Sequence, residues 1–135
     1  MKIAIIGQGY VGYALSVAAV KAGHSIIGFD TNPKLISEIK GKSDLKNYLP
    51  TNREADIKDQ DIYIIAVPTP LDEKNLPDLS FLVQATQLIA RSASKGALVI
   101  NESTSYPGTL REIVITEIEI SNKACLLYTS PSPRD

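Results

Sequence analysis

The stretch GQGYVG at residues 7–12 constrains the fold more than any other part of the sequence, because of the segments on either side. The β-branched run over residues 2–6 predicts a buried parallel strand. After the glycines, apolar residues recur with helical spacing until Gly23, which is expected to end the helix. A second strand is expected over residues 25–30. A glycine turn between a strand and a helix, with a further strand behind it, is typical of a βαβ unit.

Strands and helices continue to alternate along the rest of the chain. Strands are expected over residues 46–51, 61–68 and 97–102, and helices over residues 32–40 and 77–93. Asn32 is expected to cap the first of these helices, and Asp78 or Ser80 the second. A last helix is expected after Pro107, although the isoleucine-rich residues 111–120 could also pair as a strand. This alternation predicts an α/β fold, namely a Rossmann-like, doubly wound parallel sheet in a single domain.

Composition and charge exclude several classes of protein. The formal net charge of −1 and the pI near 5.8 provide no basic surface for nucleic acid or an anionic membrane. No apolar run approaches the roughly 18 residues of a membrane span, and the first residues lack the pattern of a signal peptide. A single cysteine fits a reducing compartment. We therefore expect a cytoplasmic protein without a metal site, which binds neither nucleic acid nor membrane.

Each glycine of residues 7–12 has its own expected task. Gly7 allows the tight turn out of the strand, and Gly9 lets a pyrophosphate approach the backbone, while Gly12 lets the helix pack closely against the sheet. The free N–H groups at the start of the helix, with its dipole, would receive the phosphates. Tyr10 and Val11 are expected to contact the dinucleotide from inside the loop. A glycine turn without a ligand is the alternative, since a GxGxxG string alone is weak evidence.

The residue that indicates which dinucleotide binds is Asp30, which ends the second strand 18 positions after Gly12. Its carboxylate can accept hydrogen bonds from the ribose hydroxyls and would repel a 2′-phosphate, which favours NAD over NADP. Lys34 lies one helical turn further on; it could reach the ribose edge, or it could be an ordinary solvated lysine. The single histidine, His24, stands in the turn before this strand and is expected to be structural.

Two further motifs follow strands whose carboxyl ends should lie at the cofactor site. In VPTP (67–70), Val67 and Pro68 begin a rigid edge, and Thr69 between the prolines can offer its hydroxyl to the cofactor. In ESTSYPGT (102–109), Ser103 and Thr104 leave the strand as neighbouring hydroxyls, near the expected position of the nicotinamide. From the residues alone, a role as turn formers or caps stays equally open.

Taken together, the motifs resemble the N-terminal domain of the UDP-glucose/GDP-mannose dehydrogenase family, which comprises NAD-dependent nucleotide-sugar 6-dehydrogenases. The resemblance is carried by MKIAIIGQGYVG, Asp30 with Lys34, AVPTPLDEKNLPDLS and NESTSYPGTLRE. With the strand-end residues above, the expected cofactor-binding set is Gly7, Gly9, Tyr10, Val11, Gly12, Asp30, Lys34, Val67, Pro68, Thr69, Ser103 and Thr104. The resemblance also implies a catalytic role for Thr104, whose hydroxyl would help to order a water beside the nicotinamide.

The chemistry is likewise implied by the resemblance. The C6 alcohol of a UDP- or GDP-sugar would be oxidised to a carboxylate by two successive hydride transfers to NAD, through a thioester on a cysteine. That cysteine belongs to downstream domains that this chain lacks, and Cys125 does not have its sequence surroundings. Residues 1–124 are therefore expected to be the NAD-binding Rossmann domain of a longer enzyme of polysaccharide biosynthesis. This truncated domain is expected to be inactive alone, and the parent enzyme to be a homodimer or a larger assembly.

The last residues, CLLYTSPSPRD (125–135), differ in character from the rest. Pro131 and Pro133 can neither continue a helix nor enter a central strand. The string resembles the translation of a transposase-type sequencing adapter. We therefore expect a non-native tail that packs loosely and does not contact the cofactor.

Two other classes of protein share some of these features. A nucleotide-sensing regulatory domain, such as those of ion channels, has a similar length and glycine loop, but it gives no role to the hydroxyls of VPTP and EST. The N-terminal domain of a β-hydroxyacid-type dehydrogenase shares the pattern of the first 30 residues. It is not expected to carry VPTP followed by ESTxxPGT, so these strand-end motifs discriminate between the classes.

Overall fold

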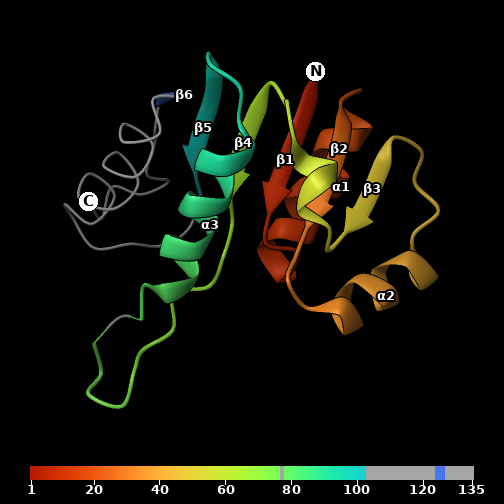
Figure 1. The fold of residues 1–135 in the computed structure, drawn as a ribbon. Coiled ribbons are helices and arrows are strands. Elements are labelled where there is room, and N and C mark those ends of the chain that lie inside the picture. The colour runs from red at the N-terminus through yellow and green to blue at the C-terminus, as the bar shows by residue number, and fades with distance from the viewer. Residues whose placement is uncertain (77, 103–123, 127–135) are drawn as a thin grey trace.

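The structure, a computed structural model, describes residues 1–76, 78–102 and 124–126 (Figure 1). Its elements in chain order are β1 (Lys2–Ile6), α1 (Tyr10–Lys21), β2 (Ser25–Phe29), α2 (Pro33–Lys42), β3 (Tyr48–Thr51), the 3₁₀ helix η1 (Glu54–Ile57), β4 (Ile62–Ile65), α3 (Ser80–Ser92), β5 (Ala97–Asn101) and β6 (Ala124–Leu126). Strands and helices alternate as the sequence predicts, and the expected strand over residues 46–51 is present as β3. None of the helices in the described ranges has the length and apolar character needed to cross a membrane.

The strands form one sheet in the order β3-β2-β1-β4-β5-β6, and every neighbouring pair is parallel. From β1 the chain runs outward to β2 and β3, and then returns to add β4, β5 and β6 on the other side of β1 (Figure 1). The strand order therefore reverses between β1 and β4. This confirms the predicted Rossmann-like, doubly wound sheet, in which ligands bind in the crevice at the point of reversal.

Both faces of the sheet are packed. On one face α3 contacts β4 and η1, and the core there is centred on Tyr63, Ile65 and Leu82, each with 0% of its surface exposed. On the other face α1 contacts β1 and β2, over a smaller core that includes Ile3 and Ile5. Because successive side chains of a strand point to opposite faces, a strand buried on both sides needs apolar residues at nearly every position. This explains the near-continuous apolar runs from which the strands are predicted.

Local signals account for the ends of the first two helices. α1 is followed by Gly23, one position beyond its C-cap, whose φ of 99° lies in the left-handed region that glycine favours. α2 begins at Pro33. The Asn32 side chain caps it by accepting hydrogen bonds from the N–H groups of Lys34 and Leu35 at 3.0 and 3.3 Å. The predictions for these helix ends are confirmed.

Three strands end earlier than the sequence predicts. β2 stops at Phe29 rather than at Asp30, β4 stops at Ile65 rather than at Pro68, and β5 stops at Asn101 rather than at Glu102. Proline lacks the N–H that a sheet ladder requires, so the VPTP segment leaves the sheet as soon as its prolines approach. The residues that follow β2 and β4, such as Asp30 and Val67, therefore lie beyond the strands at the carboxyl edge of the sheet.

The described part of the C-terminal region is β6, whose three residues pair in parallel with Ala97, Leu98 and Val99 of β5. The last two residues of β6 belong to the segment 125–135, and their place in the sheet differs from the loose packing expected for that segment. The remainder of the segment, and the region after Pro107 with its expected helix, lie outside the described residues. The non-native origin of the tail stays a prediction.

The start of α3 depends on Asp78, although Leu79 occupies the N-cap position for which Asp78 or Ser80 is predicted. The Asp78 carboxylate accepts a hydrogen bond from the Ser80 N–H at 2.9 Å. Hydrogen bonds from the Ser80 side chain and then from its backbone hold the pKa of Asp78 below its usual value of 3.8. A carboxylate whose pKa is lowered by folding stabilises the protein above its unfolded pKa, and this contribution is lost as the pH falls through the folded pKa.

We therefore expect Asp78→Ala to lower the free energy of unfolding at neutral pH, and this difference from the wild type to shrink in acid. Urea unfolding at pH 7 and at a pH below the folded pKa of Asp78 measures both values. A difference of the same size at the two pH values would show that the charge of Asp78 does not contribute.

Candidate functional site

A cleft with a volume of about 740 Å³ opens at the carboxyl ends of β1, β2 and β4. A dinucleotide crevice is expected at this place, where the strand order reverses, and the volume is within the usual range of ligand pockets. Eight residues predicted to bind the cofactor line it: Gly7, Gly9, Tyr10, Val11, Asp30, Val67, Pro68 and Thr69. The structure thus brings together three segments that are far apart in the sequence.

The glycine loop at the cleft is packed in the way its expected roles require. Gly7 has a φ of 101°, and a Cβ there would lie 2.6 Å from the carbonyl oxygen of Ala66. A Cβ on Gly12 would lie 2.7 Å from the carbonyl carbon of Gly7, and closer still to its oxygen. Gly12 is buried beneath the loop and does not line the cleft. A Cβ on Gly9 would meet nothing within 4 Å, so the backbone there is open to a ligand.

The start of α1 lies at the same end of the cleft. The first bond within the helix runs from the Tyr13 N–H to the Gly9 carbonyl at 2.9 Å. The amides that precede Tyr13 have no acceptor within the helix, and with the helix dipole they favour a negative group. Tyr10 is 94% exposed and Val11 59% exposed, so both side chains can contact a ligand. This part of the cleft can hold a pyrophosphate.

Asp30 is half-buried and firmly oriented. Its Oδ2 accepts a hydrogen bond from the Gln8 N–H at 2.9 Å, and its Oδ1 accepts one from the Asn32 N–H at 3.0 Å. An ionised carboxylate has about four acceptor positions, so each oxygen keeps capacity for a ribose hydroxyl. The carboxylate is therefore held between the glycine loop and the start of α2, with its remaining acceptor positions free for a ligand.

Lys34 is exposed on α2 and is absent from the lining of the cleft, although its neighbour Leu35 lines it. Its backbone N–H is used in the cap of α2, where it bonds to Asn32. The structure does not bring the Lys34 side chain together with the other predicted residues, so its contact with the ribose stays a prediction.

At the other end of the cleft, Thr69 lines the wall beside Val67 and Pro68. Glu102, which the sequence analysis does not single out, also lines the cleft. It directly follows β5, and its N–H donates to the Ile65 carbonyl at 2.8 Å. The predicted residues Ser103 and Thr104 lie outside the described residues, so the proposed catalytic role of Thr104 is not tested by the geometry.

A second wall of the cleft comes from α3 and η1. The sequence predicts the helix α3 but not its contribution to the cleft. Gln84, Leu88 and Arg91 line it with helical spacing along one side of α3. Glu54 of η1 lies across from them, and its Oε1 accepts hydrogen bonds from Arg91 Nη2 at 2.9 Å and Arg91 Nε at 3.2 Å. Both side chains are more than half exposed, so this ion pair adds little to stability. It closes one edge of the cleft.

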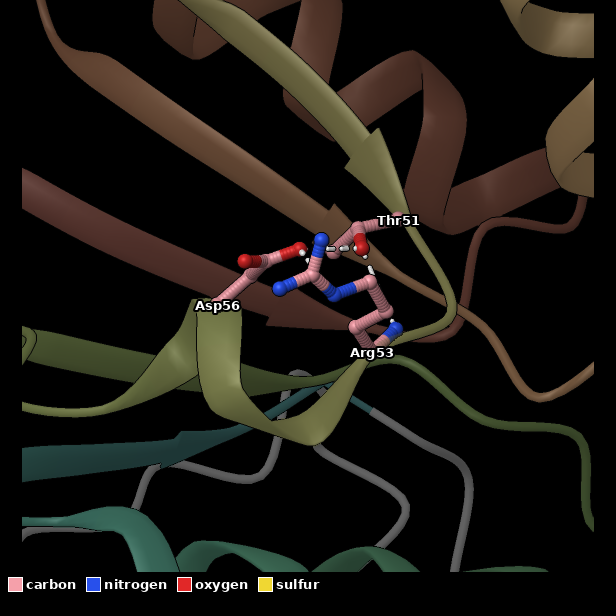
Figure 2. Close-up of polar contacts among 3 residues, drawn as sticks. All are labelled: Thr51, Arg53 and Asp56. Carbon is pink, nitrogen blue, oxygen red and sulfur yellow. Dashed lines mark hydrogen bonds and ion pairs between the residues drawn. The ribbon is translucent and has the colours of Figure 1, made fainter.

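Figure 2 shows the contacts that hold η1 in place at this edge. Thr51, the last residue of β3, donates its hydroxyl to Asp56 Oδ2 at 2.6 Å and accepts the Arg53 N–H at 3.1 Å. Arg53 Nε lies 3.9 Å from the same Asp56 oxygen. The Thr51 carbonyl in turn accepts the Asp30 N–H at 3.1 Å. The strand end that supports Asp30 therefore also fixes the short helix that carries Glu54.

The reversed strand order, the cleft at the point of reversal and Asp30 beside the glycine loop define the class of dinucleotide-binding Rossmann domains. A sequence model described as "UDP-glucose/GDP-mannose dehydrogenase family, NAD binding domain" matches residues 1–48 and 44–130. The chain belongs to this family, and its dinucleotide cofactor is NAD.

Relatives with known names agree with this assignment. The chain is 39% identical over 124 residues to the UDP-N-acetyl-D-glucosamine 6-dehydrogenase of Salmonella typhi, a match that covers 83% of this chain and 29% of that protein. It is 36% identical over 128 residues to Protein CapL of Staphylococcus aureus, covering 87% of this chain and 30% of that protein. The chain thus spans less than a third of the length of these curated relatives.

Among solved structures, a UDP-D-ManNAc dehydrogenase from Pyrococcus horikoshii is similar with a TM-score of 0.87 and 27% identity. That match covers 98% of this chain and 36% of the other. A 3-hydroxyisobutyrate dehydrogenase from Mycobacterium tuberculosis has a TM-score of 0.72 at 22% identity, and this likeness shows a shared fold alone. The family match therefore decides between the nucleotide-sugar dehydrogenases and the β-hydroxyacid-type alternative.

Proposed function

We propose that the intact protein is an NAD-dependent nucleotide-sugar 6-dehydrogenase, and that this chain supplies its NAD-binding domain. In such a reaction the C6 alcohol of a UDP- or GDP-sugar becomes a carboxylate, with water supplying the second oxygen, while two NAD molecules each accept one hydride in succession. The observation that carries the proposal is Asp30, held beside the glycine loop in a cleft lined by eight of the predicted residues. Two of the relatives are named as dehydrogenases of UDP-N-acetylglucosamine and UDP-N-acetylmannosamine, and these names favour UDP-N-acetylhexosamines as the substrate class.

Within the cleft we assign roles to the residues as follows. The backbone at Gly9 and the first amides of α1 bind the pyrophosphate, because nothing obstructs that backbone and the helix start lacks internal acceptors. Asp30 accepts the hydroxyls of one ribose. Thr69 offers its hydroxyl at the nicotinamide end of the dinucleotide. Ser103 and Thr104 would follow β5 beside the nicotinamide, where Thr104 would help to order a water; these two roles rest on the family resemblance.

We further propose that the chain alone does not oxidise sugars. The family resemblance implies a cysteine thiol as the nucleophile for the aldehyde step, and this thiol would lie beside the nicotinamide. Cys125 belongs to β6 and pairs with Leu98 near the amino end of β5, whereas the cleft lies at the carboxyl ends of the strands. The position of Cys125 in the sheet thus supports the view that the nucleophile comes from another part of the parent. The intact enzyme is proposed to act in the cytoplasm as a dimer or larger assembly.

Titration of the chain with NADH and NADPH, followed by fluorescence and calorimetry, tests the proposed cofactor preference. We expect NADH to bind at least about tenfold more tightly, which corresponds to about 1.4 kcal/mol, since the half-buried Asp30 carboxylate would repel the 2′-phosphate of NADPH. Equal affinities would overturn the preference. Incubation with NAD and UDP-N-acetylglucosamine should produce no NADH, and measurable NADH formation would refute the proposed inactivity of the isolated chain.

A further inference from the structure

Gln8, which stands between Gly7 and Gly9 in the glycine loop, is buried in the structure with 1% of its surface exposed. A polar residue between two glycines of a loop is ordinarily solvated, and the sequence offers no reason for its burial. Its Nε2 donates to the carbonyl oxygens of Gly7 at 3.0 Å and Ile5 at 3.3 Å. Because both partners are carbonyls, only the amide nitrogen can face them, which settles the orientation of the side-chain amide.

The opposite atom of the amide, Gln8 Oε1, has two donors from other elements. The Tyr48 hydroxyl of β3 donates to it at 2.6 Å. The Ser16 hydroxyl of α1 lies 3.2 Å from it and shares its one proton with the Gly12 carbonyl, which is nearer at 2.8 Å. Burial, and then the neighbouring Tyr13, raise the pKa of Tyr48. The hydroxyl therefore keeps its proton at neutral pH and acts as a donor. All polar atoms of the Gln8 side chain have partners, as a buried amide requires.

The space that Gln8 occupies is provided by Gly28 of β2. A Cβ on Gly28 would lie 2.6 Å from Gln8 Cδ, 2.8 Å from Tyr48 Cε1, and would overlap Gln8 Oε1. Gly28 pairs with Ile5 in the sheet. One side-chain amide is thus fitted between β1, β2, β3 and α1, directly under the backbone of the glycine loop.

The same residue reaches the cleft through its main chain. Its N–H donates to Asp30 Oδ2, while its side chain holds the carbonyl of Gly7. The direction of the backbone at Gly7 decides where the next amides of the loop point, and the bond to Asp30 decides where the carboxylate points. Misplacement of binding groups by small distances lowers affinity strongly, since a ligand must then distort the site.

We infer that Gln8 is a positioning residue for the dinucleotide, and that Tyr48 acts on the cofactor site through it. The inference rests on the proposed assignment of the cleft to NAD(H). Tyr48 does not line the cleft, so its hydroxyl should have no effect on cofactor affinity unless the Gln8 amide transmits it. Tyr48, Ser16 and Gly28 together keep the amide in the one orientation that orders the loop.

The decisive variant is Tyr48→Phe, which removes one hydroxyl and keeps the ring that packs edge-on against Tyr13. We expect it to weaken NADH binding about three- to tenfold, because the cofactor-binding loop loses one of the hydrogen bonds that order it. Tyr63→Phe is the matched control. The Tyr63 hydroxyl is also buried, and it lies 2.6 Å from the Ile57 carbonyl and 3.2 Å from the Ser92 carbonyl. Neither Tyr63 nor these two partners line the cleft, and Tyr63 has no contact with Gln8 among the described hydrogen bonds.

Both phenylalanine variants should unfold at lower urea concentration, because each loses a buried hydrogen bond. The Kd for NADH is measured without urea, where each variant is folded, and only Tyr48→Phe should change it. If the two variants lose stability alike and both keep the wild-type Kd, Tyr48 is merely structural and the inference is wrong. Should the wild type itself fail to bind NADH, the proposed function fails instead.

Two further measurements separate positioning from simple loss of structure. In Gln8→Met, which keeps the volume of the side chain, the additional change Tyr48→Phe should leave the Kd for NADH unaltered, since the transmitting amide is gone. In the ligand-free protein, the NMR amide signals of Gly7 and Gly9 should shift in Tyr48→Phe and not in Tyr63→Phe. Additive effects on Kd, or unshifted glycine signals, would overturn the inference, and the NMR arm does not depend on the identity of the ligand. If Gln8→Met does not fold, the comparison of the two phenylalanine variants decides.

Discussion

Asp30→Asn should reduce the preference of the chain for NADH over NADPH by about 10- to 100-fold, which corresponds to about 1.4–2.8 kcal/mol. The wild-type carboxylate would accept charge-assisted hydrogen bonds from the ribose hydroxyls and would repel a 2′-phosphate. Asparagine keeps one acceptor oxygen, so it can still accept a hydrogen bond from one of the two N–H groups, that of Gln8 or that of Asn32. The loss should therefore appear mainly in cofactor selectivity rather than in folding.

The measurement is the ratio of the two dissociation constants for wild type and variant at constant ionic strength. Asp72→Asn is the matched control. Asp72 also accepts backbone N–H groups, those of Lys74 and Leu76 at 2.8 and 3.0 Å, but it does not line the cleft. If Asp72→Asn changes the ratio as much as Asp30→Asn does, the selectivity comes from overall charge and the assigned role of Asp30 is wrong.

A second large effect is expected from Gly12→Ala, which should lower the free energy of unfolding by about 3 kcal/mol or more. The added Cβ would lie 2.7 Å from the Gly7 carbonyl carbon, whereas ordinary van der Waals contact begins at 3.4 Å. Since the atoms in the way are backbone, either α1 or the glycine loop must move. NADH binding should weaken at least about tenfold, because the helix start and the loop would no longer converge on the phosphates.

Gly41→Ala provides a control of the same chemistry with the opposite sign. Gly41 lies within α2, is exposed, and a Cβ there would meet nothing within 4 Å. Alanine is the better helix former, so this change should stabilise the protein by about 0.5–1 kcal/mol. Urea unfolding of both variants, with NADH titration of each, checks the pair. Similar changes in stability for the two variants would contradict the close contact assigned to Gly12.

The features that could be predicted from the sequence are those that depend on neighbouring residues. The buried strands are visible because a strand covered on both faces must be apolar throughout. The cap of α2 at Asn32 and the turn at Gly23 follow from the bonding of a side chain or the φ of one residue. The glycine loop and Asp30 are recognisable because the βαβ unit places them at a short, regular spacing. These signals were sufficient for the fold class and for most residues along one wall of the cleft.

The other features depend on contacts between segments that are far apart in the chain. Nothing near Gln8 in the sequence indicates that Gly28 leaves space for it or that Tyr48 donates to it, since these partners meet only when β2 and β3 are placed beside β1. The pairing of Arg91 with Glu54 likewise requires α3 to lie against η1. Lys34 stayed ambiguous because the periodicity of α2 does not say which side faces the cleft. Local spacing selects the elements, whereas the packing of the sheet and helices decides which side chains share a site.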